Sequence, residues 1–182
     1  MMKRHPSLQP LSREHHRALL CWRELDKQLS IPHSSALRSA AAALQHYWNS
    51  RFSSHLAEEE QLLLDLLSGD LRSRLLAEHD TLRSLFRSLD DTLDSNGALA
   101  IDDLASLAAT LRAHIHWEER VLFPHLQSHL STDELRFIGD RLRGRKVSED
   151  AYCDVFDDDV SSRGKRMTSV KDVPNESICG DN

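Results

Sequence analysis

The sequence contains few of the residues that build loops, disulfides and thiolate sites. In 182 residues there are six glycines, five prolines and three cysteines, and aromatic residues make up only 5%. Cys21, Cys153 and Cys179 lie far apart and form no Cys-x-x-Cys pair, which argues against a disulfide framework and against a thiolate metal site. The chain has no run of 18 apolar residues and no apolar signal segment, so we expect a cytoplasmic protein without a membrane span.

The chain also has fewer basic than acidic residues. The chain has 23 Lys and Arg against 29 Asp and Glu, a formal net charge of −6, which argues against a nucleic-acid partner. Most of the excess lies in residues 147–182, with four basic and nine acidic residues, whereas residues 1–146 are almost neutral. Because residues 147–182 show no helical or alternating apolar period, we expect a disordered acidic tail after a single domain at residues 5–146.

Within residues 5–146, apolar residues recur every three or four positions, and Leu, Ala, Arg and Glu are abundant, as is typical of amphipathic helices. Four long helices with short connections predict an all-α fold, an antiparallel up-and-down four-helix bundle with a short fifth helix. The expected helices span about residues 12–31, 35–67, 70–95, 101–123 and 132–142.

Individual residues predict where these helices begin and end. Ser12 is the expected N-cap of the first helix, and Gly69 the expected C-terminal cap of the second. Pro124 should kink or end the fourth helix. Ser131 and Glu134 have the spacing of a capping box, which predicts the start of the short fifth helix.

Histidine is abundant, with 11 copies, and its positions follow the helical period. The predicted apolar stripes are interrupted by one histidine in each long helix and by one glutamate in the second and fourth. Residues 55–63 and 114–122 also share the pattern H-x-x-x-E-E-x-x-L, which is expected well under once by chance in a chain of this composition. The inward-facing residues are His15, His55, Glu59, His79, His114 and Glu118.

A single inward histidine is compatible with an ordinary, hydrogen-bonded core residue. Six such groups are harder to accommodate, since an unpaired buried carboxylate costs several kcal/mol and a domain is stable by only about 5–15 kcal/mol. The groups therefore either pair with one another or bind a metal. Imidazole and carboxylate without thiolate suit Fe, Mn or Zn. Six groups fit two ions that share Glu59 and Glu118, with a position left open on each ion for O2, peroxide or NO.

The run H-x-x-x-E-E-x-x-L-F-P at residues 114–124, its counterpart at His55 and the single histidines of the first and third helices resemble the hemerythrin family, in its bacterial hemerythrin-like (HHE cation-binding) branch. The likeness covers about residues 5–143 and implies two non-haem iron ions in a four-helix bundle. The implied ligands are His15, His55, Glu59, His79, His114 and Glu118. Oxygen-carrying members have a further histidine where this chain has Leu75. Their acidic ligand stands five residues after the histidine of the fourth helix, where this chain has Glu119, whereas the implied ligand here is Glu118, four residues after His114. These departures place the chain closer to the sensor, iron-handling and stress-related members.

Other polar residues near the motifs have less specific expectations. Glu58, Glu60 and Glu119 are expected either in solvent or as acceptors of imidazole N–H groups. Four histidines are left outside the predicted ligand set, namely His16, His46, His116 and His125.

Three functions remain open at this stage. The first is a di-iron protein that binds O2 or NO, or senses iron or redox state; the second is a di-iron oxidoreductase or an iron-donating repair protein. The third is a metal-free helical interaction module. No dedicated acid, base or substrate pocket can be recognised in the sequence, so we expect binding rather than catalysis. The sequence predicts no particular protein partner.

Overall fold

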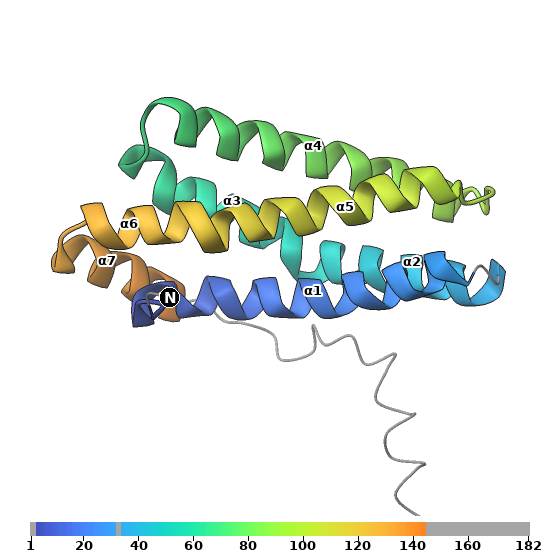
Figure 1. Ribbon diagram of the computed structural model, residues 1–182, viewed down its shortest axis with the longest axis horizontal. Coiled ribbons are helices and arrows are strands. Elements are labelled where there is room, and N and C mark those ends of the chain that lie inside the picture. The colour runs from blue at the N-terminus through green and yellow to red at the C-terminus, as the bar shows by residue number, and fades with distance from the viewer. Residues whose placement is uncertain (1–2, 32–33, 145–182) are drawn as a thin grey trace, which may run out of the picture.

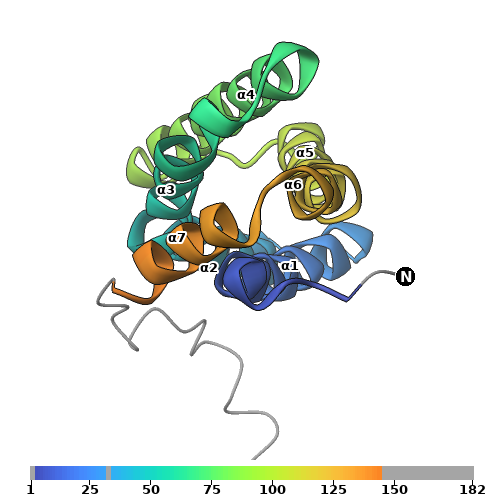
Figure 2. The ribbon, with the colours of Figure 1, turned by 90° about the vertical axis from the view of Figure 1, so that its left-hand side faces the viewer.

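The computed structural model describes residues 3–31 and 34–144, and over these residues the chain is all helical, with no strand. Four long rods, α1, α2–α3, α4 and α5–α6, lie side by side and alternate in direction, and α7 packs across one end (Figures 1 and 2). This confirms the predicted fold class. The elements are η1 (Pro6–Leu8), α1 (Gln9–Ser30), α2 (Ser34–Tyr47), η2 (Trp48–Phe52), α3 (Ser53–Leu63), η3 (Leu64–Leu66), α4 (Gly69–Asp94), α5 (Ile101–Trp117), η4 (Glu118–Leu122), α6 (Phe123–His129) and α7 (Thr132–Arg143).

Two further predictions concern membrane spans and the C-terminal residues. Among the described helices, none combines the length and the apolarity that crossing a membrane requires. The predicted acidic tail at residues 147–182 lies outside the described residues.

Two of the predicted helix boundaries are wrong. Helix α1 begins at Gln9, before the predicted N-cap Ser12, because Pro10 fits the first turn, where no backbone N–H is needed. Gly69 does not end the second helix. It is the first residue of α4 and has a φ of +55°, a left-handed conformation that glycine adopts without steric cost.

Pro124 neither kinks nor ends its rod in the predicted way. The rod continues from α5 through η4, a π-helical segment, into α6, where Pro124 lies in the first turn. The N–H of Phe123 donates to the carbonyl of Glu118, five residues earlier. Because the π-helical segment shifts the hydrogen-bond register just before the proline, its missing N–H is accommodated without a break.

The end of α4 and the start of α7 follow the expected local chemistry. Asn96 has a φ of +53° just after α4, and the N–H of Gly97 donates to the carbonyl of Thr92 at 2.9 Å. The predicted capping box is confirmed at α7, where the Ser131 hydroxyl accepts from the Glu134 N–H and the Glu134 carboxylate accepts from the Ser131 N–H.

The core consists of two apolar clusters that lie at different levels along the bundle. The first cluster includes Leu25, Leu44 and Phe86, and the second includes Leu8 and Phe123. Three of the long rods carry a residue of each cluster on either side of their predicted histidine: Leu11 and Ala18 flank His15, Leu75 and Leu82 flank His79, and Leu111 and Trp117 flank His114. The predicted polar residues therefore form a layer between two dry clusters.

Cys21 belongs to the first cluster and is buried. Cys153 and Cys179 lie outside the described residues.

Candidate metal centre

The six predicted ligands come together at the centre of the bundle, and all are buried. Their ligand atoms form two groups, each with two imidazoles and both carboxylates, in which all atoms lie within 4.8 Å of one another. Glu59 and Glu118 belong to both groups. The first group adds His15 and His55, and the second adds His79 and His114.

Distances within the two groups are short. In the first, Nε2 of His15 lies 2.9 Å from Nε2 of His55 and 3.0 Å from Oε2 of Glu118. In the second, Nε2 of His79 lies 3.5 Å from Oε2 of Glu59, and Nε2 of His114 lies 3.5 Å from Oε2 of Glu118. Ligand bonds of about 2.1 Å that meet at right angles place neighbouring ligand atoms about 3 Å apart, so these spacings fit metal coordination.

Several of these atoms have no hydrogen-bond partner. Both carboxylate oxygens of Glu59, both of Glu118, and the Nε2 atoms of His79 and His114 are buried and unpartnered. Buried polar atoms are normally hydrogen-bonded, and an unpaired buried group costs free energy. A cation between these atoms would satisfy all of them at once, so the donor set fits a metal site.

A second carboxylate holds each of the four imidazoles from behind, through the Nδ1 atom. These four outer glutamates are Glu14, Glu60, Glu78 and Glu119. The Nδ1 to carboxylate distances are 2.8 Å for His15 with Glu119, 2.8 Å for His55 with Glu14, 2.7 Å for His79 with Glu60, and 3.0 Å for His114 with Glu78. Because a carboxylate accepts from Nδ1–H, each contact fixes its ring so that the Nε2 atom faces the centre.

These contacts run around the bundle in one direction. The rod of α5 and η4 supports the imidazole of α1, α1 supports that of α3, α3 supports that of α4, and α4 supports that of α5. Each rod therefore supplies one imidazole to the centre and one carboxylate to its neighbour. The orientation of every imidazole depends on how two rods pack.

An arginine binds each outer glutamate in turn. The shortest distances are 2.6 Å from Arg4 to Glu119, 2.7 Å from Arg51 to Glu14, 2.7 Å from Arg83 to Glu60, and 2.6 Å from Arg74 to Glu78. Four guanidinium groups thus balance the charge of four outer carboxylates. These charge-assisted contacts also hold the carboxylates in position behind the imidazoles.

The electrostatic setting is governed by these contacts. Burial lowers the pKa of His79, but the Glu118 and Glu59 carboxylates, 3.7 and 3.5 Å from its Nε2 atom, outweigh it and raise the pKa to about 10. Burial raises the pKa of Glu59, but the charge of His55 and the nearby imidazoles bring it well below its usual range. A cation that enters the centre must therefore displace protons from imidazoles, whereas the carboxylates are already ionised.

The structure decides between the two expectations for the neighbouring glutamates. Glu60 and Glu119 accept from imidazoles, whereas Glu58 binds Arg51 at 3.1 Å. Glu14 and Glu78 were not among the predicted site residues, although a repeated signal was available: each directly precedes a predicted histidine ligand. The four arginines were not predicted either. Arg74 has a helical i,i+4 spacing to Glu78, but nothing in the spacing of Arg4 or Arg51 connects them to a distant glutamate.

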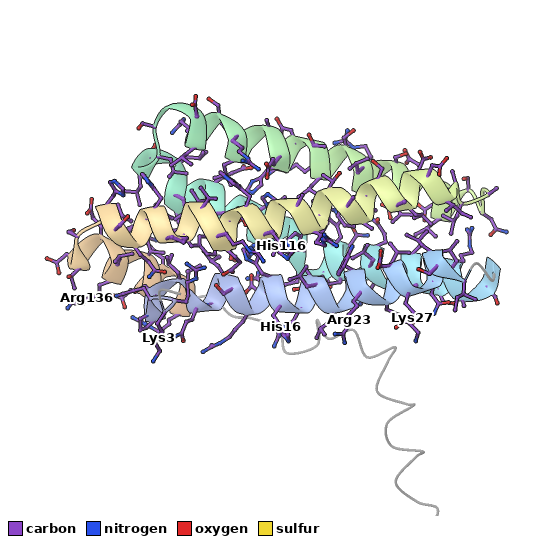
Figure 3. All side chains as sticks on the ribbon, viewed as in Figure 1. Lys3, His16, Arg23, Lys27, His116 and Arg136 are labelled. Atoms are coloured by element: carbon purple, nitrogen blue, oxygen red, sulfur yellow. The ribbon has the colours of Figure 1, made fainter. Side chains whose placement is uncertain are left out.

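The histidines left outside the predicted set lie away from the centre. His16 and His46 are exposed, and Figure 3 shows His16 pointing outward from α1 beside Arg23 and Lys27. His125 and His129 stack on each other on α6, with ring centroids 3.9 Å apart. Neither belongs to the two ligand groups.

Comparison with known proteins identifies a family but no individual relative. No curated protein is similar enough to this chain to be matched. The family model described as the hemerythrin HHE cation-binding domain matches residues 7–126, which extend from η1 to α6. This range includes all six predicted ligands, the four outer glutamates and three of the four arginines that bind them. The chain belongs to the hemerythrin HHE cation-binding family.

Proposed function

We propose that this protein binds two non-haem iron ions through His15, His55, Glu59, His79, His114 and Glu118. One ion is held by His15 and His55, the other by His79 and His114, and Glu59 and Glu118 are shared between them. Manganese and zinc suit the same nitrogen and oxygen donors, so the identity of the metal is part of the test.

The observation that carries this proposal is the sharing of the two carboxylates. Glu59 and Glu118 each approach imidazoles of both groups, and none of their four oxygens makes a well-aligned hydrogen bond. A metal-free helical interaction module is the weaker candidate, because six buried ionisable groups would then have only ion pairs with one another, and burying such pairs costs desolvation free energy.

The proposed role of the centre is reversible binding of O2 or NO, or a response to iron or redox state. The two ions would supply the redox-active, incompletely coordinated metal at which such small molecules bind. The chain's own residues orient the imidazoles through the outer glutamates and keep bulk water out through the apolar clusters on both sides. Small diatomic ligands suit a centre that is enclosed in this way.

The test begins with the metal-free chain, reconstituted with iron(II) under anaerobic conditions and then exposed to air or to NO. We expect new absorption in the visible range that is lost when His114→Ala removes one imidazole. The matched control His116→Ala alters a histidine two residues away that lies outside the ligand groups, and it should leave the spectrum unchanged. A reconstituted chain with no spectral response to either gas would contradict the proposed ligands.

A further inference from the structure

The two halves of the candidate centre have the same donor atoms but different surroundings. We define the His15 half as His15 and His55 with their outer glutamates, and the His79 half as His79 and His114 with theirs. In the His15 half the supporting arginines are shielded from solvent. The exposed fraction of the side chain is 10% for Arg51 and 18% for Arg4.

Both of these arginines are also held by further contacts. Arg51 binds Glu58 at 3.1 Å in addition to Glu14. Arg4 donates to the backbone carbonyl of Glu119 at 2.7 Å and to the side chain of Gln127 at 2.9 Å, besides the Glu119 carboxylate. The guanidinium groups behind the His15 half are therefore fixed by several partners each.

The arginines of the His79 half lie closer to solvent. The exposed fraction is 32% for the Arg83 side chain and 51% for the Arg74 side chain. Each also has a second contact, Arg83 with the exposed Asp80 at 3.2 Å and Arg74 with the ring of Trp117 at 4.5 Å. Arg74 binds Glu78 from the next turn of the same helix, where both side chains are within reach of water. Ion pairs in such positions hold their partners less tightly than shielded pairs do, because water and salt compete for both groups.

The imidazoles of the His15 half also pack against phenyl rings. The ring of Phe123 stacks on His15 with centroids 5.4 Å apart, and Phe52 stacks on His55 with centroids 4.8 Å apart. Among the described residues, the recorded ring contact of His79 and His114 is with each other, at 5.0 Å. The imidazoles of the His15 half are therefore packed on one face, and rotating either ring away from the centre requires a phenyl ring to move.

An ion leaves such a centre when an imidazole turns aside or when water replaces it. Both events are easier where the supporting carboxylate is loosely held and no ring packs against the imidazole. We propose that the two ion positions are kinetically unequal, and that the ion held by His79 and His114 exchanges first, at a rate controlled by Arg74 and Arg83. This rests on the proposed function, because it requires two ions to bind.

The inference gives Arg74 and Arg83 a positioning role. Neither reaches the centre, and each acts through its outer glutamate on one imidazole. The exchangeable half would be the route by which metal enters and leaves, while the His15 half retains its ion. Incomplete loading would then yield a chain with a single ion in a defined position.

The experiment measures iron release from the full chain, loaded with iron(II) and kept anaerobic, after mixing with an excess of a chromogenic iron(II) chelator. We expect two phases of equal amplitude, one iron each. Arg74→Gln and Arg83→Gln should each speed the fast phase about 10-fold and leave the slow phase unchanged. Phe123→Leu, in the His15 half, should speed the slow phase alone. Arg136→Gln, on an exposed arginine of α7, serves as the control and should alter neither phase.

The outcomes separate the inference from the function on which it rests. Release of two irons in a single phase, or a fast phase that responds to Phe123→Leu and not to Arg74→Gln, would overturn the inference while two-ion binding stands. A chain that takes up no iron before mixing would overturn both. Because Arg74 and Arg83 are partly exposed, their variants are expected to fold, and helical circular dichroism before loading checks this.

Discussion

The Nδ1 atom of His15 lies 2.8 Å from Oε1 of Glu119, which is the residue next to the candidate ligand Glu118. Two consecutive glutamates thus have separate tasks, since Glu118 faces the centre and Glu119 supports an imidazole from another rod. The same division holds at Glu59 and Glu60, where Glu60 supports His79. In each of the two Glu-Glu pairs, the first glutamate therefore faces the centre and the second supports an imidazole of another rod.

Removing the support of Glu119 should weaken metal binding without removing a ligand. We expect Glu119→Ala to lower iron(II) affinity about 10- to 100-fold, because the His15 imidazole would lose the acceptor that fixes its orientation. Competition with a chelator of known affinity measures this. Glu134→Ala alters a glutamate of the α7 capping box, which contacts none of the four imidazoles, and should leave the iron(II) affinity unchanged. An equal loss of affinity in both variants would contradict the role of Glu119.

Arg51 should matter for folding as well as for the site. Its guanidinium group is buried against Glu14, at 2.7 Å, and replacing it by methionine removes one charged partner of that buried carboxylate. We expect Arg51→Met to lower the free energy of unfolding by about 3–5 kcal/mol. Urea denaturation measures the loss.

The control for Arg51 is Arg136→Met. Arg136 forms an exposed pair with Asp133 on α7, and such pairs contribute about 0–1 kcal/mol. If the two variants lost similar amounts of unfolding free energy, the buried pair of Arg51 and Glu14 would contribute no more to stability than an exposed pair.

The stability of the metal-free chain should depend on pH in two opposite ways. The folded pKa of His79, about 10, lies above the ordinary histidine value of 6.5, so its protonation stabilises the fold fully below pH 6.5, and this contribution is lost as pH rises towards 10. For Glu119, burial raises the pKa but hydrogen bonds with His15 and Ser12 lower it to about 2, below the ordinary glutamate value of 4.5. That contribution is present above pH 4.5 and is lost as pH falls towards 2.

Urea titrations of the metal-free chain between pH 2 and 10 test both limbs. We expect the free energy of unfolding to be highest between about pH 4.5 and 6.5 and to fall on either side. Glu119→Gln should flatten part of the acidic limb. A metal-free chain that becomes steadily more stable from pH 6.5 to 10 would refute the alkaline limb.

Gly139 tests the close packing of α7 against η1, the short helix that follows Arg4. A Cβ atom at Gly139 of α7 would lie 2.6 Å from Oγ of Ser7 and 3.1 Å from its Cα, so α7 and η1 approach too closely for a larger residue. We expect Gly139→Ala to cost about 1–3 kcal/mol, because backbone must move. Gly144→Ala, whose Cβ would meet nothing nearer than 3.5 Å, is the control in thermal unfolding.

Helical periodicity predicts most of this fold and all six candidate ligands, because a residue's face on a helix follows from its spacing to apolar neighbours. It also places His16 outside, where it is found. Hydrogen-bond register is less accessible: the π-helical segment at Glu118–Leu122, which lets the rod continue through Pro124, has no simple sequence signature. The outer contacts depend on how two rods pack, so Glu14 could not be assigned to His55 from spacing alone.

Metal stoichiometry tests the central claim most directly. The chain, reconstituted anaerobically with iron(II) and freed of loosely bound metal, should retain about two irons per chain by elemental analysis. His55→Ala and His79→Ala, which remove one imidazole from each group, should each retain less, while His46→Ala should retain as much as the unaltered chain. A correctly folded chain that retains no iron, manganese or zinc under these conditions would contradict the account.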